Sequence, residues 1–439
     1  MNTLSFIILS LTLTLSGQID IRDLISLRDN PDTKAGVLDL SQTEIAGHTF
    51  TRPAYAGHAH FDANIIPQYI FFRSPYDSII LPGNITAIGN GAFSASDITS
   101  ITIPEGVTSI GDYAFYGCPR LQTVILPSTL RHIGKGAFAA CPSLTHLDLS
   151  HTAVTEIPER CFATSSSLNR LLLPAGILSV GREAFAATAL NTLNLPGVRT
   201  LAPYALAGMD RLERVILNKE AQYDKGTLMN DPRLVDVSGM PDIVPPLFAA
   251  NCRTLVPGNI LDTAVHIGEY AFSNNQADIL ILSAGIMAID RGAFAGLYAL
   301  HTINADALLG DTPDIDPQAF SGLNPADITL HVSPGCEQPW RDHPVWGLFN
   351  ITSSETVGTD IIDNDIAASI VISIHDNTLT ITAAEPITAA TVHDITGATI
   401  ANLTAAGARI DYPLDNVTPR ILIINASAGG VTRTAKLLR

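Results

Sequence analysis

Two histidines one residue apart, His58 and His60, are the first side chains in this sequence that suggest chemistry. In an extended segment both point to the same side of the chain, as two ligands of a metal ion would. The neighbouring residues indicate no third ligand, so we expect no metal site. The sequence also lacks the Gly-x-Ser-x-Gly, His-Glu-x-x-His and phosphate-binding glycine-loop motifs of common enzymes. It therefore predicts a protein that is not an enzyme and has no cofactor.

Acidic residues gather in one short stretch near the C-terminal third of the chain, at Asp360, Asp363 and Asp365. Such a stretch can bind calcium, but its spacing lacks the glycine and the glutamate of a calcium-binding loop. A solvated linker is therefore the favoured interpretation of residues 353–366.

The chain has five cysteines, an odd number that excludes complete pairing within it. Cys118 and Cys141 each follow an Ala-Phe pair at the same distance, which makes them neighbours in the repeat described below. They could form a disulfide. The alternative, which we favour, is that each is a small buried apolar side chain.

The charge of the chain argues against nucleic acid as a partner. The 42 acidic residues outnumber the 25 basic ones, which gives a net charge of −17. A protein of this charge is repelled by nucleic-acid phosphates and by anionic lipid surfaces. We therefore expect no nucleic-acid partner.

The first 17 residues are typical of a secretory signal peptide. Residues 4–15 are largely apolar, and Ser16-Gly17 provides small residues before a polar Gln18. No Lys or Arg precedes the apolar stretch, so an N-terminal helix packed on the fold is the alternative. No stretch reaches the roughly 20 apolar residues that span a membrane, so no transmembrane helix is expected. A secreted or surface-exposed protein is predicted.

An internal repeat becomes visible when residues 101–115 are compared with residues 124–138. Both have the order apolar-x-apolar-Pro, then Ile-Gly, then Ala-Phe, and a leucine precedes the next copy. Leu206 and Leu228 fill two gaps in the series of phenylalanines, which gives about eleven repeats of 20 to 26 residues. The recurring phenylalanines are Phe93, Phe115, Phe138, Phe162, Phe185, Phe248, Phe272, Phe294 and Phe320.

Each part of the repeat has a physical role. The apolar-x-apolar pair predicts a short strand with two inward side chains, and the proline ends that strand. The glycine is expected to permit a tight turn, and the phenylalanine to fill the middle of the coil. One repeat cannot bury its own apolar face, whereas stacked repeats share one core. The pattern predicts a solenoid with a parallel sheet on one face and irregular or short helical turns on the other.

The repeat resembles the BspA-like class of leucine-rich repeats found in bacterial surface proteins. The unit Ile-x-Ile-Pro, Ile-Gly, Ala-Phe and Cys-Pro-x-Leu carries the resemblance, most clearly at residues 101–144. The resemblance covers residues 79–352 and implies a leucine-rich repeat solenoid whose partners are host proteins or other bacterial surface proteins. Residues 193–260 depart from the pattern, and we expect irregular coils there.

Both ends of the repeat array are expected to be capped. Residues 18–78 predict a short helical segment and a strand that together cover the edge of the first coil. At the other end, Trp340, Trp346 and Phe349 resemble the terminal capping segment of the BspA-like class.

Residues 367–439 predict a small all-β sandwich, because short alternating segments are separated by turns at Thr396-Gly397 and Gly429-Gly430. This segment resembles the C-terminal sorting domain of proteins exported by type IX secretion. The resemblance rests on residues 392–397 and 419–424 and on the final strand, and it departs from the family at Arg420-Ile421. It implies the secretion machinery as a partner and a location outside the outer membrane of a Gram-negative bacterium. A generic β-sandwich is the alternative.

The outward face of the predicted sheet is the candidate binding site. At the outward position Ile125, Leu172 and Ile216 alternate with polar residues. An apolar stripe on an open sheet suggests a protein-binding surface, although β-branched residues also simply favour strands. The candidate binding residues are Thr102, Thr123, Ile125, His146, Asp148, Arg170, Leu172, Asn194, Arg214 and Ile216.

Together these features predict a secreted or surface protein that recognises or adheres to another protein through this sheet face. Two alternatives stay open. A carbohydrate-handling protein would need an aromatic platform or a carboxylate pair in a cleft, whereas aromatic residues make up only 6% of the chain and most are assigned to the core. A purely structural spacer would have a uniformly polar sheet face, and the apolar stripe argues against it.

Overall fold

The computed structural model divides into two units, Met1–Ser353 and Ser354–Arg439, which are described separately. The described residues are 7–9, 12–29, 36–51, 58–255, 261, 263–308, 311–353, 371–375, 378–383, 386–393, 399–403, 407–414, 421–428 and 431–438.

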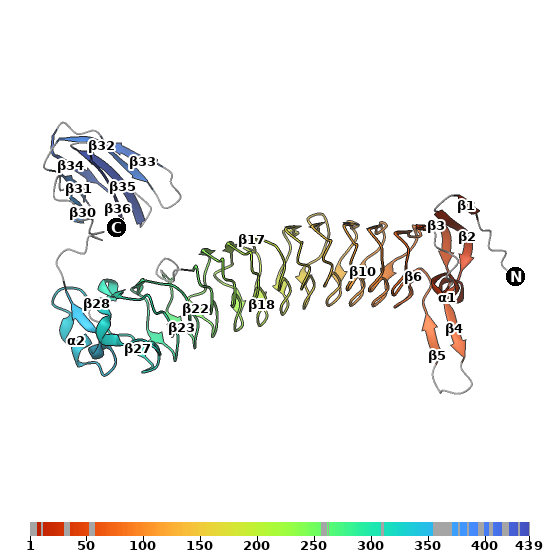
Figure 1. The fold of residues 1–439 in the computed structure, drawn as a ribbon, viewed down its shortest axis with the longest axis horizontal. Helices are drawn as coiled ribbons and strands as arrows, with labels where there is room; N and C mark the ends of the chain where they lie inside the picture. The colour runs from red at the N-terminus through yellow and green to blue at the C-terminus, as the bar shows by residue number, and fades with distance from the viewer. Residues whose placement is uncertain are drawn as a thin grey trace. The chain divides into compact units, whose positions relative to one another are not determined.

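Unit 1 is a solenoid of stacked coils, which confirms the predicted leucine-rich-repeat architecture (Figure 1). The described coils contribute three-residue strands to a first row of parallel strands, and the middle residue of each strand is almost always buried. Where adjacent strands pair, they align without a shift, so that Ser100 lies opposite Thr123. The first row consists of β7 (Ser78–Ile80), β9 (Ser100–Thr102), β11 (Thr123–Ile125), β13 (His146–Asp148), β15 (Arg170–Leu172), β17 (Thr192–Asn194), β19 (Arg214–Ile216), β21 (Asp236–Ser238), β24 (Ile279–Ile281), β26 (Thr302–Asn304), β28 (Thr329–His331) and β29 (Asn350–Thr352).

A second row of parallel strands runs along the same coils, and the sequence analysis did not foresee it. Each strand has two residues, the first facing outward and the second nearly always inward, as in Ser109-Ile110 beside His132-Ile133. One polar residue followed by one apolar residue is sufficient to form such a two-residue strand. The second row consists of β6 (Ile65–Ile66), β8 (Ala87–Ile88), β10 (Ser109–Ile110), β12 (His132–Ile133), β14 (Glu156–Ile157), β16 (Ser179–Val180), β18 (Thr200–Leu201), β20 (Gln222–Tyr223), β22 (Ile243–Val244), β23 (His266–Ile267), β25 (Ala288–Ile289) and β27 (Asp314–Ile315).

A turn follows the second strand of each coil, and its backbone also bonds to the next coil. In one such turn the amide of Phe115 donates to the carbonyl of Ala137 at 2.9 Å. The turn contains two residues with positive φ four positions apart, for example Tyr113 and Gly117 with φ of 55° and 69°. At the first of these positions, a tyrosine on one coil covers a glycine on the next coil at four described places. The pairs are Tyr69 and Gly91, Tyr113 and Gly136, Tyr204 and Gly226, and Tyr270 and Gly292.

Phenylalanines fill the centre of the coils, as predicted. Phe93 and Phe115 stack with ring centroids 5.1 Å apart and an angle of 2° between the rings, and the stack extends from Phe71 to Phe185. Leu206 and Leu228 continue the series, and both are fully buried.

The irregular coils expected over residues 193–260 are not found among the described residues up to 255. Strands β17, β19 and β21 pair in register, with Thr192, Arg214 and Asp236 side by side. These coils depart from the repeat pattern in their side chains and not in their backbone pairing. The amide of Ala249 donates to Ala271, as that of Phe272 donates to Ala293, so Ala249 occupies the phenylalanine position.

Phe248 therefore stands one residue before the position that the sequence pattern assigned to it. Its ring meets Phe272 edge-on at 74° instead of stacking. Phe and Ala have changed places in this coil, while the backbone ladder is unchanged.

The glycine after isoleucine has a different role from the one expected. Gly111 and Gly134 are not among the glycines with positive φ. A Cβ on Gly134 would lie 2.3 Å from the backbone nitrogen of Asp112 on the preceding coil. Glycine at position 134 thus fits the close approach of two coils, and it is not there because the turn needs an unusual conformation.

The N-terminal elements extend the first row, with β3 paired to β7 and β2 paired in parallel to β3. Leu13, Leu15 and Ile19 of β2 are buried. The predicted cleavage site after Gly17 thus lies inside a strand of the sheet. The elements are β1 (Ile7–Leu9), β2 (Thr12–Ile19), α1 (Ile21–Asp29), β3 (Val37–Ile45), β4 (His48–Thr51) and β5 (His58–Phe61).

The last coils end in a compact aromatic cluster. Trp340 and Trp346 are fully buried, and the indole of Trp346 donates to the carbonyl of Pro313 at 3.0 Å. Phe320, the last phenylalanine of the series, contacts both Trp346 and Phe349. The helices of this region are η2 (Asp306–Leu308), η3 (Pro325–Asp327), α2 (Glu337–Asp342) and η4 (Trp346–Leu348).

Unit 2 consists of antiparallel strands in two sheets that share one small core, in agreement with the predicted all-β fold. One sheet has the order β30-β31-β34 and the other β33-β32-β35-β36. The strands are β30 (Val371–His375), β31 (Thr378–Thr382), β32 (Ile387–His393), β33 (Thr399–Leu403), β34 (Arg409–Pro413), β35 (Ile421–Ala428) and β36 (Val431–Leu438). The predicted linker with its three aspartates lies almost entirely outside the described residues.

Candidate binding surface

The candidate binding residues of the first row all face away from the core. Thr102, Ile125, Asn194 and Ile216 end their strands and are exposed, whereas Asp148 and Leu172 at the same position are half-buried. The residues that begin these strands and are also exposed are Thr123, His146, Arg170 and Arg214. The structure brings the ten residues onto one surface; their role in binding stays a prediction.

Apolar side chains on this surface are separated by polar ones. Ile125 is 55% exposed and Ile216 is 38% exposed. Ile125 lies beside Thr102, and Ile216 lies between Asn194 and Ser238. Because neighbouring strands are about 4.8 Å apart, apolar contacts recur about every 9.6 Å along the row.

Charged groups of both signs accompany the apolar side chains. Arg214 and Asp236, which begin adjacent strands, form an ion pair at 2.8 Å. The hydroxyl and the amide of Ser150 donate to the carboxylate of Asp148 and lower its pKa, so Asp148 is ionised at neutral pH. The surface therefore offers apolar, cationic and anionic contacts within a few strands, a mixture typical of protein interfaces.

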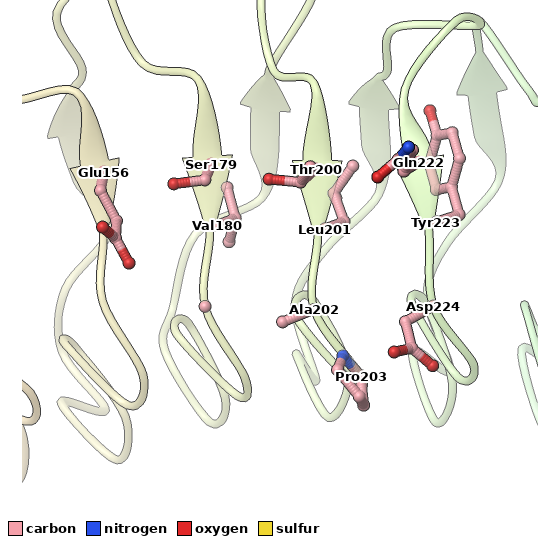
Figure 2. Close-up of a pocket in the computed structure, with 11 residues that line it drawn as sticks. Glu156, Ser179, Val180, Thr200, Leu201, Ala202, Pro203, Gln222, Tyr223 and Asp224 are labelled. Carbon is pink, nitrogen blue, oxygen red and sulfur yellow. The ribbon is translucent and has the colours of Figure 1, made fainter.

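A shallow hollow lies on the second row, over β14, β16, β18 and β20. Figure 2 shows the outward side chains Glu156, Ser179, Thr200 and Gln222 in a line on successive strands. Tyr223 closes one end; its hydroxyl donates to the carbonyl of Asn218 at 2.7 Å, and burial raises its pKa. Sequence reasoning missed this surface, although the polar residue before each inward-facing residue of the second row was a signal for it.

Metal-binding side chains do not converge in the part of the chain that the structure describes. No group of three or more His, Cys, Asp or Glu residues there is placed to hold an ion. His58 and His60 lie in β5, and their side chains are outside the described residues. The helices of the described segments include none that is long and apolar enough to cross a membrane.

Cys118 and Cys141 are adjacent, buried and unpaired. The thiol of Cys118 donates to the carbonyl of Phe93 at 3.0 Å, and that of Cys141 to the carbonyl of Phe115 at 3.1 Å. These bonds to the backbone agree with the favoured interpretation of both residues as small buried side chains.

The coils, the strand rows and the open sheet face together define a leucine-rich-repeat solenoid. Residues 64–191 and 246–333 match the model of the BspA type leucine rich repeat region in six copies. These two stretches are thus repeats of the BspA leucine-rich type. The segment between the two matched stretches keeps the same coils although its sequence does not match.

Among the similar solved structures, one with a TM-score above 0.5 supports the fold. A leucine-rich repeat protein from Bacteroides ovatus aligns with a TM-score of 0.56 at 21% identity, covering 81% of this chain and 99% of that one. The pneumococcal vaccine antigen PcpA aligns at 0.40 and 14% identity over 81% and 98% of the two chains. A leucine rich cell surface protein from Faecalibacterium prausnitzii aligns at 0.33 and 17% identity over 81% and 94%. No curated protein matches this sequence.

Proposed function

We propose that this protein is a secreted or surface-exposed binding protein, without enzymatic activity, that recognises a protein partner through the first strand row. The observation that carries the proposal is the outward-facing apolar stripe of exposed Ile125 and Ile216 with half-buried Leu172, set among charged and polar side chains. An open solenoid presents a wide surface that suits a macromolecule better than a small substrate.

A location at the cell surface is supported by two observations. The first 17 residues have the composition of a secretory signal peptide. One solved relative is described as a cell surface protein and another as a vaccine antigen. Mass spectrometry of the secreted protein tests the signal peptide, since cleavage after Gly17 leaves Gln18 as the first residue.

The test of the binding surface is a triple variant, Ile125→Ser with Leu172→Ser and Ile216→Ser. We expect the labelled variant to lose binding to intact host or bacterial cells while its melting temperature changes little, because these side chains face outward. Ile243→Ser is the matched control, since Ile243 is 67% exposed on the second row.

Unchanged cell binding by the triple variant would show that the first row is not the recognition surface. Unfolding of the triple variant would instead mean that the three side chains belong to the core, since a shift of one residue exchanges the two faces of a strand.

We also propose that the C-terminal β unit is a sorting domain of the type IX kind. The proposal is supported by the sequence resemblance and by the separation of this unit from the repeats. Deletion of residues 367–439 is expected to leave the repeats folded, because solenoid coils contact mainly their neighbours. The truncated protein should stay in the cell envelope, and normal delivery to the surface in cell fractionation contradicts the sorting role.

A further inference from the structure

Four aromatic side chains are exposed together at the turns of the first coils, on a different surface from the first strand row. Tyr69 and Phe72 are 51% and 40% exposed, and Tyr113 and Tyr116 are 36% and 45% exposed. Large aromatic groups on a surface are a frequent mark of a binding site. We call this set the aromatic edge.

The four rings form two pairs of the same shape. Tyr69 and Phe72 are perpendicular, with centroids 6.5 Å apart and an angle of 85°; Tyr113 and Tyr116 are 5.8 Å apart at 89°. In each pair the first tyrosine lies over a glycine of the next coil, Gly91 or Gly136. Each pair is thus a notch with one ring as its floor and the other as its wall.

The coil between the two notches has only small side chains at the equivalent positions. Gly91 takes the place of the floor tyrosine and Ser94 the place of the wall ring. The two notches are therefore two coils apart, which is about 9.6 Å at about 4.8 Å per coil. No large side chain at these positions blocks the path between them.

We propose that the aromatic edge binds a proline-rich polypeptide segment in the polyproline II conformation. This helix has three residues per turn and a rise of about 3.1 Å, so residues three apart face the same side at about 9.3 Å. That distance matches the separation of the two notches. Prolines at positions i and i+3 then enter one notch each, in the way that aromatic-lined grooves recognise proline-rich ligands.

Hydrogen-bond donors complete the site. A polyproline II segment has no internal hydrogen bonds, so its carbonyls need donors from the partner. Within the described part of the chain, the hydroxyls of Tyr69, Tyr113 and Tyr116 make no hydrogen bond. Arg73, whose guanidinium lies 5.1 Å from the centre of the Phe72 ring, adds a cation beside the first notch.

The site is confined to the first coils. At the same turn position the two coils after that of Gly136 carry Arg160 and Glu183, which pair with each other at 2.7 Å. Tyr204, further along, lies under the guanidinium of Arg182 at 5.8 Å. Two of these coils therefore each form a notch of two aromatic rings. Two notches suit a short motif better than a long polymer.

The shape of the notches favours proline over sugar. A polysaccharide stacks on broad, flat ring faces, whereas here a wall ring stands at right angles beside each floor ring. This geometry surrounds a small saturated ring on two sides. It also offers a rigid surface to a ligand that is itself preorganised, which lowers the entropic cost of binding.

The test uses fluorescence anisotropy of the full chain with a labelled oligoproline that spans both notches, and a Gly-Ser peptide of equal length as the control probe. The main variant is Tyr69→Gly with Tyr113→Gly. It should fold, because glycine already occupies this position with the same positive φ in Gly91 and Gly136. Tyr298→Gly is the matched control, since Tyr298 is 79% exposed but stands outside the aromatic edge.

We expect the double variant to weaken oligoproline binding at least about tenfold, and Tyr298→Gly to leave it unchanged. The variant Tyr69→Phe with Tyr113→Phe should lose less oligoproline affinity, about threefold, which is the usual effect of one or two lost hydrogen bonds. The proposal is overturned if oligoproline does not bind, or binds equally to the double variant. Binding of a β-glucan oligosaccharide in place of oligoproline, lost in the double variant, would show that the ligand class is wrong.

Discussion

Residues 64–191 and residues 192–255 have the same backbone and different interiors. In the first stretch phenylalanines stack from Phe71 to Phe185, whereas the second has leucine twice and then Phe248, displaced by one residue. The strands of both stretches pair without a shift. The hydrogen-bond ladder between coils therefore sets the register, and the side chains fill the space that it leaves.

A buried carboxyl group is the second difference between the two stretches. Asp231 is fully buried, and its Oδ1 accepts a hydrogen bond from the amide of Met209 at 2.7 Å. Ser165 in the first stretch does the same for Cys141 at 3.0 Å, and Asn275 does it for Cys252 at 3.0 Å. Burial raises the pKa of Asp231 well above its usual value, so the second stretch holds an acidic group where a neutral one would serve.

The largest effect is expected from breaking the aromatic stack. Phe138 has ring partners on both sides, at 5.3 Å and 6.1 Å. Phe138→Ala should lower the free energy of unfolding by about 3–5 kcal/mol, and Leu206→Ala by about 2–3 kcal/mol, because a smaller cavity forms. Equilibrium unfolding in urea measures both free energies. A greater loss for Leu206→Ala than for Phe138→Ala would contradict the larger contribution of the phenylalanine stack.

A smaller effect is expected where coils approach closely. Gly134→Ala should cost about 1–3 kcal/mol, because the new Cβ would meet the backbone of Asp112 at 2.3 Å and the backbone cannot move aside easily. The second stretch has Ala202 at this position, and Ala202→Gly should cost only about 0.5–1 kcal/mol. Thermal melting of the two variants measures the difference. Equal losses of stability would show that the close approach of the coils does not make glycine necessary at position 134.

The smallest effect is expected from Asp231→Asn, and it should depend on pH. The pKa of Asp231 is higher in the folded than in the unfolded chain, so the stability it contributes is present in acid and is lost as the pH rises through the folded-state pKa. Asparagine keeps the acceptor for Met209 and does not ionise. The variant should gain about 1 kcal/mol at pH 7 and little near pH 4. A gain that is the same at both pH values would mean that Asp231 does not change its charge on folding.

Much of the fold follows from the sequence because the same pattern of apolar residues, glycine and phenylalanine recurs in most of the repeats. The spacing of phenylalanines predicted the solenoid, and the alternation around Ile125 predicted which side chains face outward. The second strand row was missed because two residues are too few to show a period. Phe248 was misplaced by one because an aromatic residue satisfies the pattern from either of two adjacent positions.

Surfaces were harder to predict than the core. The first-row residues could be located because a strand alternates its faces, whereas the aromatic edge depends on a turn whose conformation the sequence did not reveal. Tyr69 and Phe72 also precede the stretch that the sequence analysis assigned to the repeats. Their neighbours in space, Tyr113 and Tyr116, are more than forty residues away along the chain.

The alternation of tyrosine and glycine at the turns has a consequence for how such an array changes in length. Loss of the single coil 123–145 would bring Tyr113 directly before Arg160, so the Tyr113 ring would lose the glycine, Gly136, that it covers. Loss of the two coils 100–145 would keep a glycine before Arg160. The alternation is interrupted at Arg160, Glu183 and Tyr204, which occupy this position on successive coils, and again at Leu247 directly before Tyr270. Where tyrosine and glycine do alternate, insertions and deletions should therefore be tolerated best in pairs of coils.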